Sequence, residues 1–496
     1  MLNHVSRRFF LGGVFAGLAG PGWAGPPAVS LRPRTRPEDF GGRTEPPVSG
    51  LIDAAQLGGR VTYAVVDVAT GKVLESQGGG LGQPPASVTK VITALYSLDV
   101  LGPQFRFETR LLASGPVRDG VVDGDLILAG GGDPTLDTDE LADMAARLKE
   151  AGVREVRGKF RVWSGALPYQ RVIDPSQPEH VSYNPSLSGL NLNYNRVHFE
   201  WKRAGQGYSV TMDARSARYR PEVRVARMAV AKRSLPVYTY ADRGDHDAWS
   251  VASGALGKGG SRWLPVRRPA AYAAEVFATF ARAHGIVLTP GRPLGETPGG
   301  QILLTHKSAP LSEILRGMLK YSNNLTAELV GLTATARRRG KPAPLAASAR
   351  EMSAWAQDLL RIPGAHLVDH SGLGEASRLG AASLAHALAQ MHADGLLKPL
   401  LKPFPMRDSN GKAVPDHPIN VAAKTGTLYF VSSLAGYVTA PGSPELAFAI
   451  LAANTELREG YDRTTGERPP GAYGWNRRAK KLQQGLIERW TRVYGS

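Results

Sequence analysis

The chain has 496 residues, enough for about two to four structural units at roughly 100–200 residues each. Hydrophobic residues make up 42% and charged residues 21%, so a chain that is disordered throughout is excluded. The net charge of +17 leaves an anionic partner open, whereas the absence of cysteine excludes disulfides, thiolate nucleophiles, cysteine-bound zinc and iron–sulfur clusters.

Residues 1–24 have the pattern of an export signal. Arg7 and Arg8 precede a mildly apolar run, which is too short for the ~20 residues that span a bilayer as a helix. The segment resembles a bacterial twin-arginine signal, with an ordinary Sec signal or a short anchor as alternatives. It predicts an exported, periplasmic protein without a transmembrane anchor. Residues 25–48 are rich in Pro, Gly and Arg and predict a flexible lead.

The first half of the mature chain alternates between strand and helix patterns. A strand pattern with a Thr-Gly turn predicts a hairpin over 61–74, and a helix is expected over 87–98. Asp137 is placed to cap a further helix that ends near Gly152. Residues 159–265 are mostly strand-like and rich in turns and arginine.

The second half begins with helices and ends with strands and one helix. Helical stripes are predicted over 270–284 and 311–319, and a new helix is expected to start at Thr326. Paired strands and a last amphipathic helix follow, at 420–427, 433–439, 445–454 and 476–494. Antiparallel strands at the end of a helix-rich chain favour an α+β fold over a doubly wound sheet.

Ser87 and Lys90 lie at the expected start of a helix. A spacing of three places the hydroxyl and the amine on one helical face. A serine becomes a good nucleophile only when a base takes its proton, and lysine is such a base when burial or a nearby cation lowers its pKa. Taken alone, the pattern also fits a solvated, capped helix start.

Ser322 and Asn324 lie between two predicted helices. A loop that presents a hydroxyl and a carboxamide can pass a proton to a leaving amine and hold a substrate amide. The alternative is an Asn-rich helix boundary without a catalytic role.

Lys424, Thr425 and Gly426 form a Lys-Thr-Gly sequence inside a strand-like run. The cation and the hydroxyl suit a substrate carboxylate, and the glycine lets a ligand backbone approach. The alternative is an exposed edge-strand lysine that discourages aggregation.

The order Ser-x-x-Lys, Ser-x-Asn, Lys-Thr-Gly is typical of serine β-lactamases and penicillin-binding proteins. Two features select one group within this superfamily. They are the long separation of Lys90 from Ser322 and sequence segments such as LILAGGGDPTL and LNLNYN. The chain resembles the class C low-molecular-mass penicillin-binding proteins, which are D-alanyl-D-alanine carboxypeptidases and endopeptidases of peptidase family S13.

This resemblance implies an α+β fold with a transpeptidase-like catalytic domain, an antiparallel sheet flanked by helices. It also implies a large, mostly β insert between the first two motifs. The predicted division is a catalytic part at 49–107, an insert of one or two lobes at 108–265 and a second catalytic part at 266–496.

The resemblance also implies the catalytic roles. Ser87 is the acylated nucleophile, Lys90 its base, and Ser322 a proton relay. The backbone N–H groups of Ser87 and Thr427 form the oxyanion hole.

Substrate binding is implied for the residues around these groups. Asn324 binds the substrate amide, and Lys424 with Thr425 handles the terminal carboxylate, in the strand that continues through Gly426 and Thr427.

Two segments depart from the family pattern. The family usually has an Asp-x-Ser-like segment where this chain has Trp-Ser-Gly at 163–165, which leaves the side-chain specificity for stem peptides open. His370 replaces a glycine in the Asp-His-Ser-Gly-Leu sequence at 369–373. We expect His370 in a surface loop, with an added catalytic role as the alternative.

The predicted activity is a serine-type D-Ala-D-Ala carboxypeptidase, and also an endopeptidase on peptidoglycan cross-links. Peptidoglycan stem peptides are the expected partners and β-lactams the acylating inhibitors, with no nucleic acid, metal or cofactor. Rival readings are a β-lactamase, although no Glu-x-x-Leu-Asn occurs between Ser322 and Lys424, and a catalytically silent cell-wall scaffold. Oligomeric state is left open.

Overall fold

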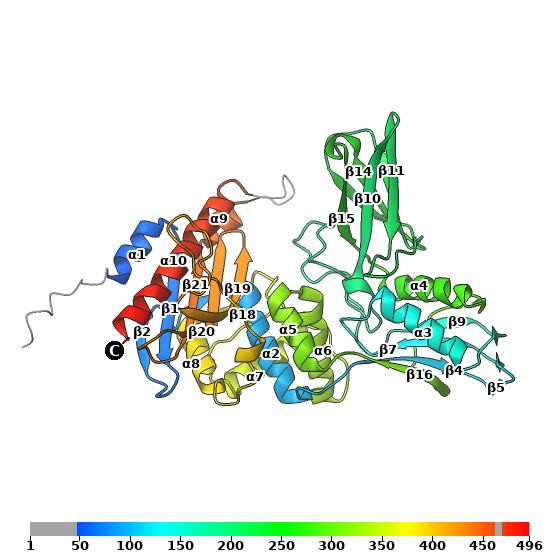
Figure 1. Cartoon of the computed structure of the whole chain (residues 1–496), viewed down its shortest axis with the longest axis horizontal. Helices are drawn as coiled ribbons and strands as arrows, with labels where there is room; N and C mark the ends of the chain where they lie inside the picture. Colours follow the sequence, from blue (N-terminus) through cyan, green and yellow to red (C-terminus); the bar gives the residue numbers. More distant parts are fainter. Residues whose placement is uncertain (1–46, 462–468, 496) are drawn as a thin grey trace, which may run out of the picture. The chain divides into compact units, whose positions relative to one another are not determined.

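The computed structural model describes residues 47–461 and 469–495. The predicted signal segment at 1–24 and nearly all of the predicted lead at 25–48 lie outside these residues. The fold is α+β, as the element order predicted, and contains a large antiparallel sheet together with several smaller sheets (Figure 1).

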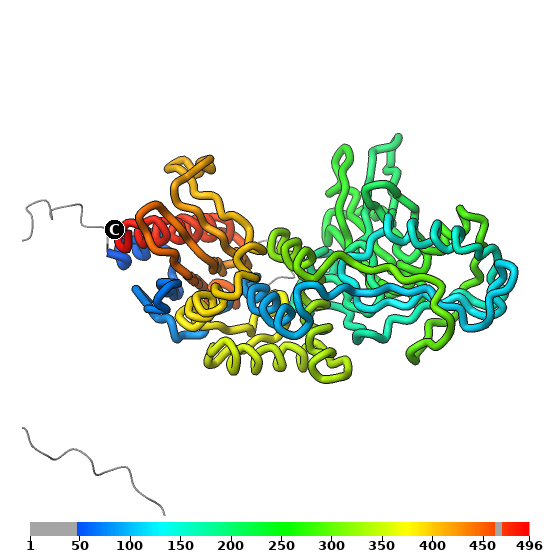
Figure 2. The backbone as a smooth tube through the Cα atoms, turned by 60° about the horizontal axis from the view of Figure 1, so that its bottom comes forward, coloured from blue at the N-terminus to red at the C-terminus, as the bar shows by residue number. Residues whose placement is uncertain are grey.

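A six-stranded antiparallel sheet joins the first strands of the chain to the last. Its order is β18 (Lys402–Pro403), β19 (Asn420–Leu428), β20 (Val431–Thr439), β21 (Leu446–Ala453), β1 (Arg60–Asp67) and β2 (Val73–Gln77). All eight residues of β21 are buried, as expected for a central strand covered on both faces. The blue strands at the start of the chain therefore lie beside the orange strands from near its end (Figure 2).

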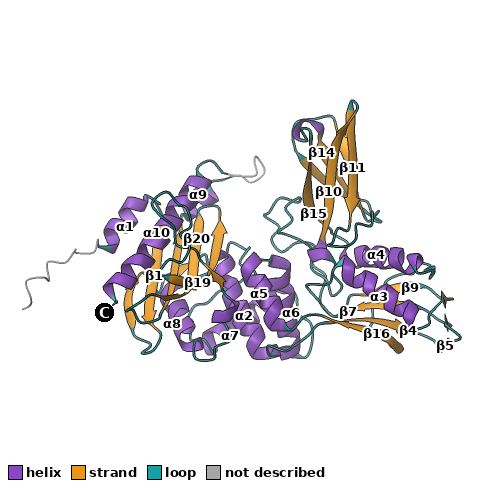
Figure 3. Ribbon diagram, in the orientation of Figure 1, coloured by secondary structure: helices purple, strands orange, loops and turns teal. Residues whose placement is uncertain are grey.

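Helices cover both faces of this sheet (Figure 3). One face packs against α1 (Val48–Ala55) and α10 (Ala472–Val493). The other face packs against a second group of helices, namely α2 (Thr89–Leu101), α5 (Leu311–Tyr321), α6 (Asn324–Arg339), α7 (Leu345–Asp358) and α8 (Ala381–Met391). Because α2, α5 and α6 lie in one core, two of the three sequence motifs are brought into the same helical layer.

The segment between α2 and α5 builds a separate hydrophobic core. A four-stranded sheet has the order β16 (Gln301–Lys307), β4 (Glu108–Ala113), β7 (Leu126–Gly130) and β9 (Phe160–Trp163). It shares its core with α3 (Thr138–Glu150) and α4 (Pro269–Ala283).

The same core includes residues of two three-stranded sheets. Their orders are β11 (Gly207–Asp213), β10 (Arg196–Ala204), β15 (Gly259–Pro265), and β12 (Ala226–Ala231), β14 (Asp247–Ala252), β13 (Tyr238–Asp242). Short elements complete the described chain, namely β3 (Gly82–Gln83), β5 (Val117–Arg118), β6 (Val121–Val122), β8 (Glu155–Val156), β17 (Leu379–Gly380), η2 (Ala86–Val88), η3 (Asn193–Asn195), η4 (Ser253–Ala255), η5 (Lys398–Leu400) and α9 (Thr455–Glu459).

The division of the chain into domains remains a proposal. Residues of α4 and β16 pack in the core of the insert, and β16 pairs with β4. We therefore propose an insert that extends over 108–307, with the second catalytic part beginning after β16.

Most elements follow the sequence pattern closely. The predicted cap at Asp137 is confirmed, since its side chain accepts from the Glu140 N–H at 2.9 Å while the Glu140 carboxylate accepts from the Asp137 N–H. The predicted terminal strands are β19, β20 and β21. The helix expected from Thr326 begins two residues earlier, at Asn324, because Asn323 provides the cap.

Trp490 is the residue of α10 on which we test this packing. It is fully buried, and its ring lies 5.8 Å from that of Tyr63 and 6.1 Å from that of Phe448, centroid to centroid. Trp490→Ala should lower the free energy of unfolding by about 3–5 kcal/mol, measured by denaturant titration with circular dichroism. Tyr473→Ala, at an 81% exposed position of the same helix, should change it by less than about 0.5 kcal/mol. Equal midpoints for the two variants would contradict this packing.

Candidate active site

Ser87 lies in the short turn η2 that leads into α2. The preceding residue, Ala86, has a left-handed backbone with φ 47°, which is costly for a residue with a Cβ and is retained mainly where surrounding structure imposes it. Ser87 is half-buried, whereas Lys90 in the first turn of α2 is fully buried. The turn therefore presents the hydroxyl at a surface and directs the amine inward.

The Lys90 amine has three oxygen neighbours. Nζ donates to the Asn324 side-chain oxygen and to the Ser371 carbonyl oxygen, both at 2.7 Å, and lies 3.1 Å from Ser87 Oγ. Two of these partners are carbonyl oxygens, which can only accept. A neutral amine that keeps both bonds must point its lone pair toward Ser87 Oγ, the arrangement needed to take the hydroxyl proton.

Burial favours the neutral form of the Lys90 amine. It lowers the pKa of Lys90 to about 8, because desolvation of the ammonium outweighs the opposing charges of Glu328 and Asp369. Lys90 therefore meets the condition given above for a lysine that acts as a base, namely a pKa lowered by burial. The alternative of a solvated helix start is wrong, since the side chain is removed from water.

Ser322 and Asn324 project from a sharp turn between α5 and α6. Ser322 has a left-handed backbone, φ 57° and ψ 38°, and ends α5. The Asn323 side chain accepts from the Thr326 N–H at 2.9 Å and so caps α6. Asn324 donates through its amide nitrogen to the Tyr183 carbonyl of the insert at 2.8 Å. The turn thus joins the catalytic helices to the insert beside Lys90.

Lys424 lies in the middle of β19 and is only 2% exposed. Its Nζ donates to Ser322 Oγ at 3.0 Å and to the Thr425 carbonyl oxygen at 2.6 Å. Burial, with smaller effects from the charges of Lys90 and Lys402, holds its pKa well below the usual lysine value. The alternative of an exposed edge lysine is therefore wrong.

Gly426 brings β19 against the turn that carries Ser87. A Cβ atom at position 426 would lie 2.6 Å from the Pro85 carbonyl oxygen and 3.1 Å from the Ser87 nitrogen. Only a residue without a side chain fits this approach. Thr425 and Thr427, which alternate with Gly426 along the strand, are exposed.

The three motifs therefore meet as two hydrogen-bonded groups. Ser87, Lys90 and Asn324 form one, and Ser322 with Lys424 forms the other. Thr425 and Thr427 belong to the strand beside Ser87 but have exposed side chains.

Sequence reasoning missed the residues beneath Lys90. Ser371 supplies an acceptor for the Lys90 amine, and Glu328 accepts from the backbone of the same loop. Ser371 belongs to the Asp-His-Ser-Gly-Leu sequence noted above, and Glu328 follows Asn324 by one helical turn. This spacing is the only sequence signal that pointed to Glu328.

The expectation of His370 at a surface is wrong. It is fully buried, its Nε2 lies 2.8 Å from Ser348 Oγ, and burial lowers its pKa to about 3. The room for the ring comes from Gly331 of α6, because a Cβ there would lie 2.2 Å from the imidazole. His370 is thus a neutral packing residue beneath the site.

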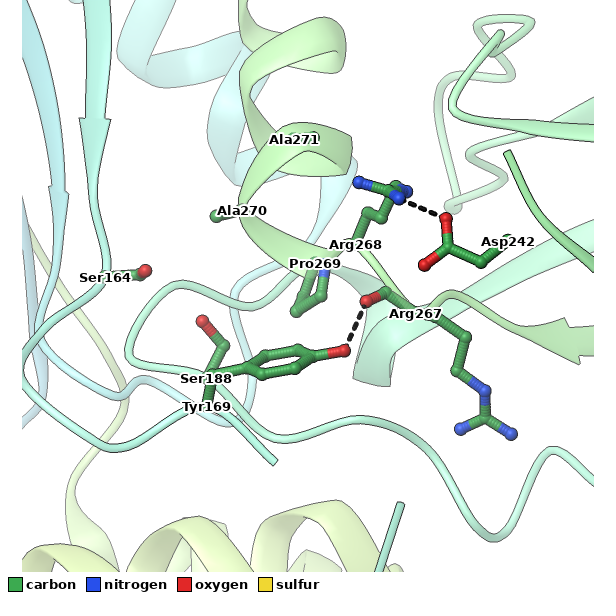
Figure 4. A pocket seen from close by; sticks show the side chains of 9 residues that line it. All are labelled: Ser164, Tyr169, Ser188, Asp242, Arg267, Arg268, Pro269, Ala270 and Ala271. Atoms are coloured by element: carbon green, nitrogen blue, oxygen red, sulfur yellow. Dashed lines mark hydrogen bonds and ion pairs between the residues drawn. The ribbon is translucent and has the colours of Figure 1, made fainter. Parts of the chain in front are cut away.

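A pocket of about 370 Å³ in the insert has no residue of the three motifs in its lining. Figure 4 shows it at the first turn of α4, where the Tyr169 hydroxyl donates to the Arg267 carbonyl oxygen and Arg268 pairs with Asp242. The Arg267 side chain leads away from the pocket and donates to the carbonyl oxygens of Asn184 and Glu179. Arg267, Arg268 and Asp242 therefore each have a partner within the insert.

A hydroxyl beside a buried amine, a second hydroxyl held by another buried lysine, and a strand that packs on the turn of the first hydroxyl are typical of the serine β-lactamase and penicillin-binding class of hydrolases. Comparisons with known proteins identify the family. The family model of the D-Ala-D-Ala carboxypeptidase 3 (S13) family matches residues 48–467. The chain therefore belongs to this family and is a serine-type D-Ala-D-Ala carboxypeptidase, which confirms the resemblance found in the motifs.

Characterised relatives cover most of the chain. It is 30% identical over 440 residues to a D-alanyl-D-alanine carboxypeptidase of Actinomadura sp. (strain R39), covering 82% of this chain and 80% of that protein. It is 26% identical to D-alanyl-D-alanine carboxypeptidase DacB of Haemophilus influenzae, covering 81% and 87% of the two chains.

The fold is shared with a solved structure. The crystal structure of penicillin binding protein 4 (dacB) from Haemophilus influenzae matches with a TM-score of 0.74 at 21% identity, covering 90% of this chain and 99% of that chain. Another structure of that protein, complexed with a β-lactam, has a TM-score of 0.71 at 20% identity and covers 90% and 99% of the two chains.

Within 47–461 and 469–495, none of the helices combines the length and the apolar character needed to cross a membrane.

The contact between Gly331 and His370 can be tested by two matched glycine substitutions. Gly331→Ala forces a methyl group into the imidazole and should destabilise the fold by about 1–3 kcal/mol. Gly317→Ala, in α5 with no atom within 4 Å of the new Cβ, should stabilise it by about 0.4–1 kcal/mol. Denaturant titrations measure both. A Gly331→Ala protein as stable as Gly317→Ala would show that His370 does not pack on α6.

Proposed function

We propose that Ser87 is the acylated nucleophile of this carboxypeptidase and that Lys90 is its base. The observation that carries the proposal is the 3.1 Å contact between Lys90 Nζ and Ser87 Oγ, with two carbonyl oxygens holding the other positions of the amine. Neutral Lys90 takes the Ser87 proton as Oγ attacks the carbonyl carbon of the penultimate D-Ala. The backbone N–H groups of Ser87 and Thr427 receive the oxyanion.

Ser322 completes the proton path. Its hydroxyl accepts from Lys424 and donates its proton to the amine of the departing D-Ala as the C–N bond breaks. The proton that Lys90 took from Ser87 replaces the one that Ser322 gives up, so Lys90 is again a neutral amine. Water then attacks the acyl-enzyme, loses a proton to the same base, and releases the shortened peptide with Ser87 restored.

The substrates are stem peptides of peptidoglycan that end in D-Ala-D-Ala. Lys424 and Thr425 bind the terminal carboxylate, Asn324 binds the peptide amide, and Gly426 lets β19 approach the turn that carries Ser87. The same site cleaves D-Ala cross-links as an endopeptidase when a second stem replaces the leaving D-Ala. β-Lactams acylate Ser87 because their ring amide mimics the scissile bond.

The enzyme acts outside the cytoplasm, where peptidoglycan is found. The twin-arginine pattern at 1–24 supports export to the periplasm, and the excess of Lys and Arg in the rest of the chain favours association with an anionic cell wall.

Labelling with a fluorescent penicillin tests the nucleophile. Wild-type protein should form a long-lived covalent adduct and release D-Ala from a pentapeptide, and Ser87→Ala should do neither. Ser97→Ala, about three helical turns after Ser87, should keep both activities. An adduct on Ser87→Ala would overturn the assignment, rapid hydrolysis of the penicillin would indicate a β-lactamase, and peptidoglycan binding without D-Ala release would indicate a silent scaffold.

The pH dependence of acylation tests the base. Below the Lys90 pKa of about 8 the amine is protonated and cannot accept the Ser87 proton. The second-order rate constant for penicillin acylation should therefore rise about tenfold per pH unit up to pH ~8 and level off above it. A rate that is constant from pH 6 to 9, in protein shown to be folded by circular dichroism, would contradict Lys90 as the base.

A further inference from the structure

Glu328 is a buried carboxylate on the same face of α6 as Asn324, one helical turn later. Both of its oxygens are used. Oε2 accepts from the His370 N–H and Oε1 from the Ser371 N–H, each at 2.9 Å. A carboxylate is the side chain that can accept from two neighbouring backbone N–H groups at once.

The loop that Glu328 holds, residues 369–374, touches both catalytic groups. The Ser371 carbonyl accepts from the Lys90 amine at 2.7 Å. Gly372, with φ +75°, passes so close to the turn before Ser87 that a Cβ there would lie 1.8 Å from the Ala86 carbonyl oxygen. A shift of the loop would therefore move the acceptor of Lys90 and press on the turn that carries the nucleophile.

Other contacts fix this loop from its remaining sides. Asp369 accepts from the N–H groups of Gly372 and Gly374, both at 2.6 Å, and closes the loop on itself. Thr93 of α2 donates to the His370 carbonyl oxygen at 2.6 Å. Glu328 hydrogen-bonds the loop to α6, the helix that also supplies Asn324.

We propose that Glu328 is a positioning residue for acylation: its carboxylate holds the 369–374 loop that places the Lys90 amine, and it adds a negative charge to the groups beneath that amine. The proposal rests on the proposed roles of Ser87 and Lys90. It concerns a residue that belongs to none of the three motifs.

The charges around Glu328 fix the sign of its effect. Lys90 faces it from α2, and Asp369 and the neutral His370 face it from the loop. The Glu328 charge raises the pKa of Lys90 against the larger effect of burial. Burial and the neighbouring Asp369 raise the pKa of Glu328, whereas the hydrogen bonds from Ser371 and His370 and the charge of Lys90 oppose this rise and favour the carboxylate. Without the Glu328 charge, Lys90 should lose its proton at a lower pH.

The test is the pH profile of penicillin acylation for Glu328→Gln, measured between pH 5.5 and 9.5. The amide offers one acceptor and one donor where two acceptors are needed, so one backbone N–H loses its partner. The acidic limb of the profile, where the rate constant rises with pH, should move about one pH unit lower, because an opposite charge near Lys90 is removed. The plateau should fall about 10- to 100-fold, the cost of a base displaced by about 1 Å.

Glu328→Asp distinguishes the effect of the carboxylate charge from the effect of the side-chain length. It keeps the carboxylate on a shorter side chain, so the limb should stay at the wild-type pH while the plateau falls. Glu351→Gln is the matched control, since it makes the same change in a 29% exposed side chain of α7 that pairs with Arg338. It should leave both limb and plateau unchanged.

Each outcome decides the proposal. Wild-type limb and plateau in Glu328→Gln, or a limb shifted equally in Glu328→Asp, would overturn it. If Glu328→Gln does not fold, a wild-type plateau in Glu328→Asp would overturn it. Failure of the proposed function looks different, because wild-type protein would then lack either Ser87-dependent labelling or the acidic limb, whatever residue stands at 328.

Discussion

The burial of the Lys90 amine is the constraint on which the rest of the site depends. A lysine in water is almost fully protonated at neutral pH and cannot act as a base. Enclosing it lowers its pKa, but an enclosed amine needs acceptors for its N–H groups. The Asn324 side chain and the Ser371 carbonyl supply them, and their directions leave the remaining position for Ser87. One arrangement thus supplies the buried amine with acceptors for its N–H groups and places it beside Ser87.

The antiparallel sheet provides the frame that makes this enclosure possible. Because β1 pairs with β21, the two ends of the catalytic chain form one layer, and β19 lies where Gly426 meets the turn of Ser87. The helices on that side carry the first two motifs in a shared core. The insert reaches the same place, since the Tyr183 carbonyl accepts from Asn324. A large insertion between motifs is therefore compatible with a site built from all three, and here it contributes a contact.

Much of the fold and the motif positions could be predicted from local sequence. The cap at Asp137, the strands around Lys424 and the helix after Ser322 follow from side-chain patterns over a few residues. The position of His370 could not be predicted, because its burial depends on the missing side chain of Gly331 in another helix. The pairing of β16 with β4 depends likewise on how the last segment of the insert returns to its first strand.

The sequence by itself determined the chemistry available, namely a serine and lysine one helical turn apart, a second serine and asparagine, and a lysine-threonine-glycine strand. Only the tertiary structure decided the state of that chemistry. Lys90 meets Asn324 across 234 residues and Ser371 across 281 residues of chain. Glu328 is added to the same network from α6. Protonation depends on burial and on neighbouring charges, and both are set by contacts between segments that are distant in the sequence.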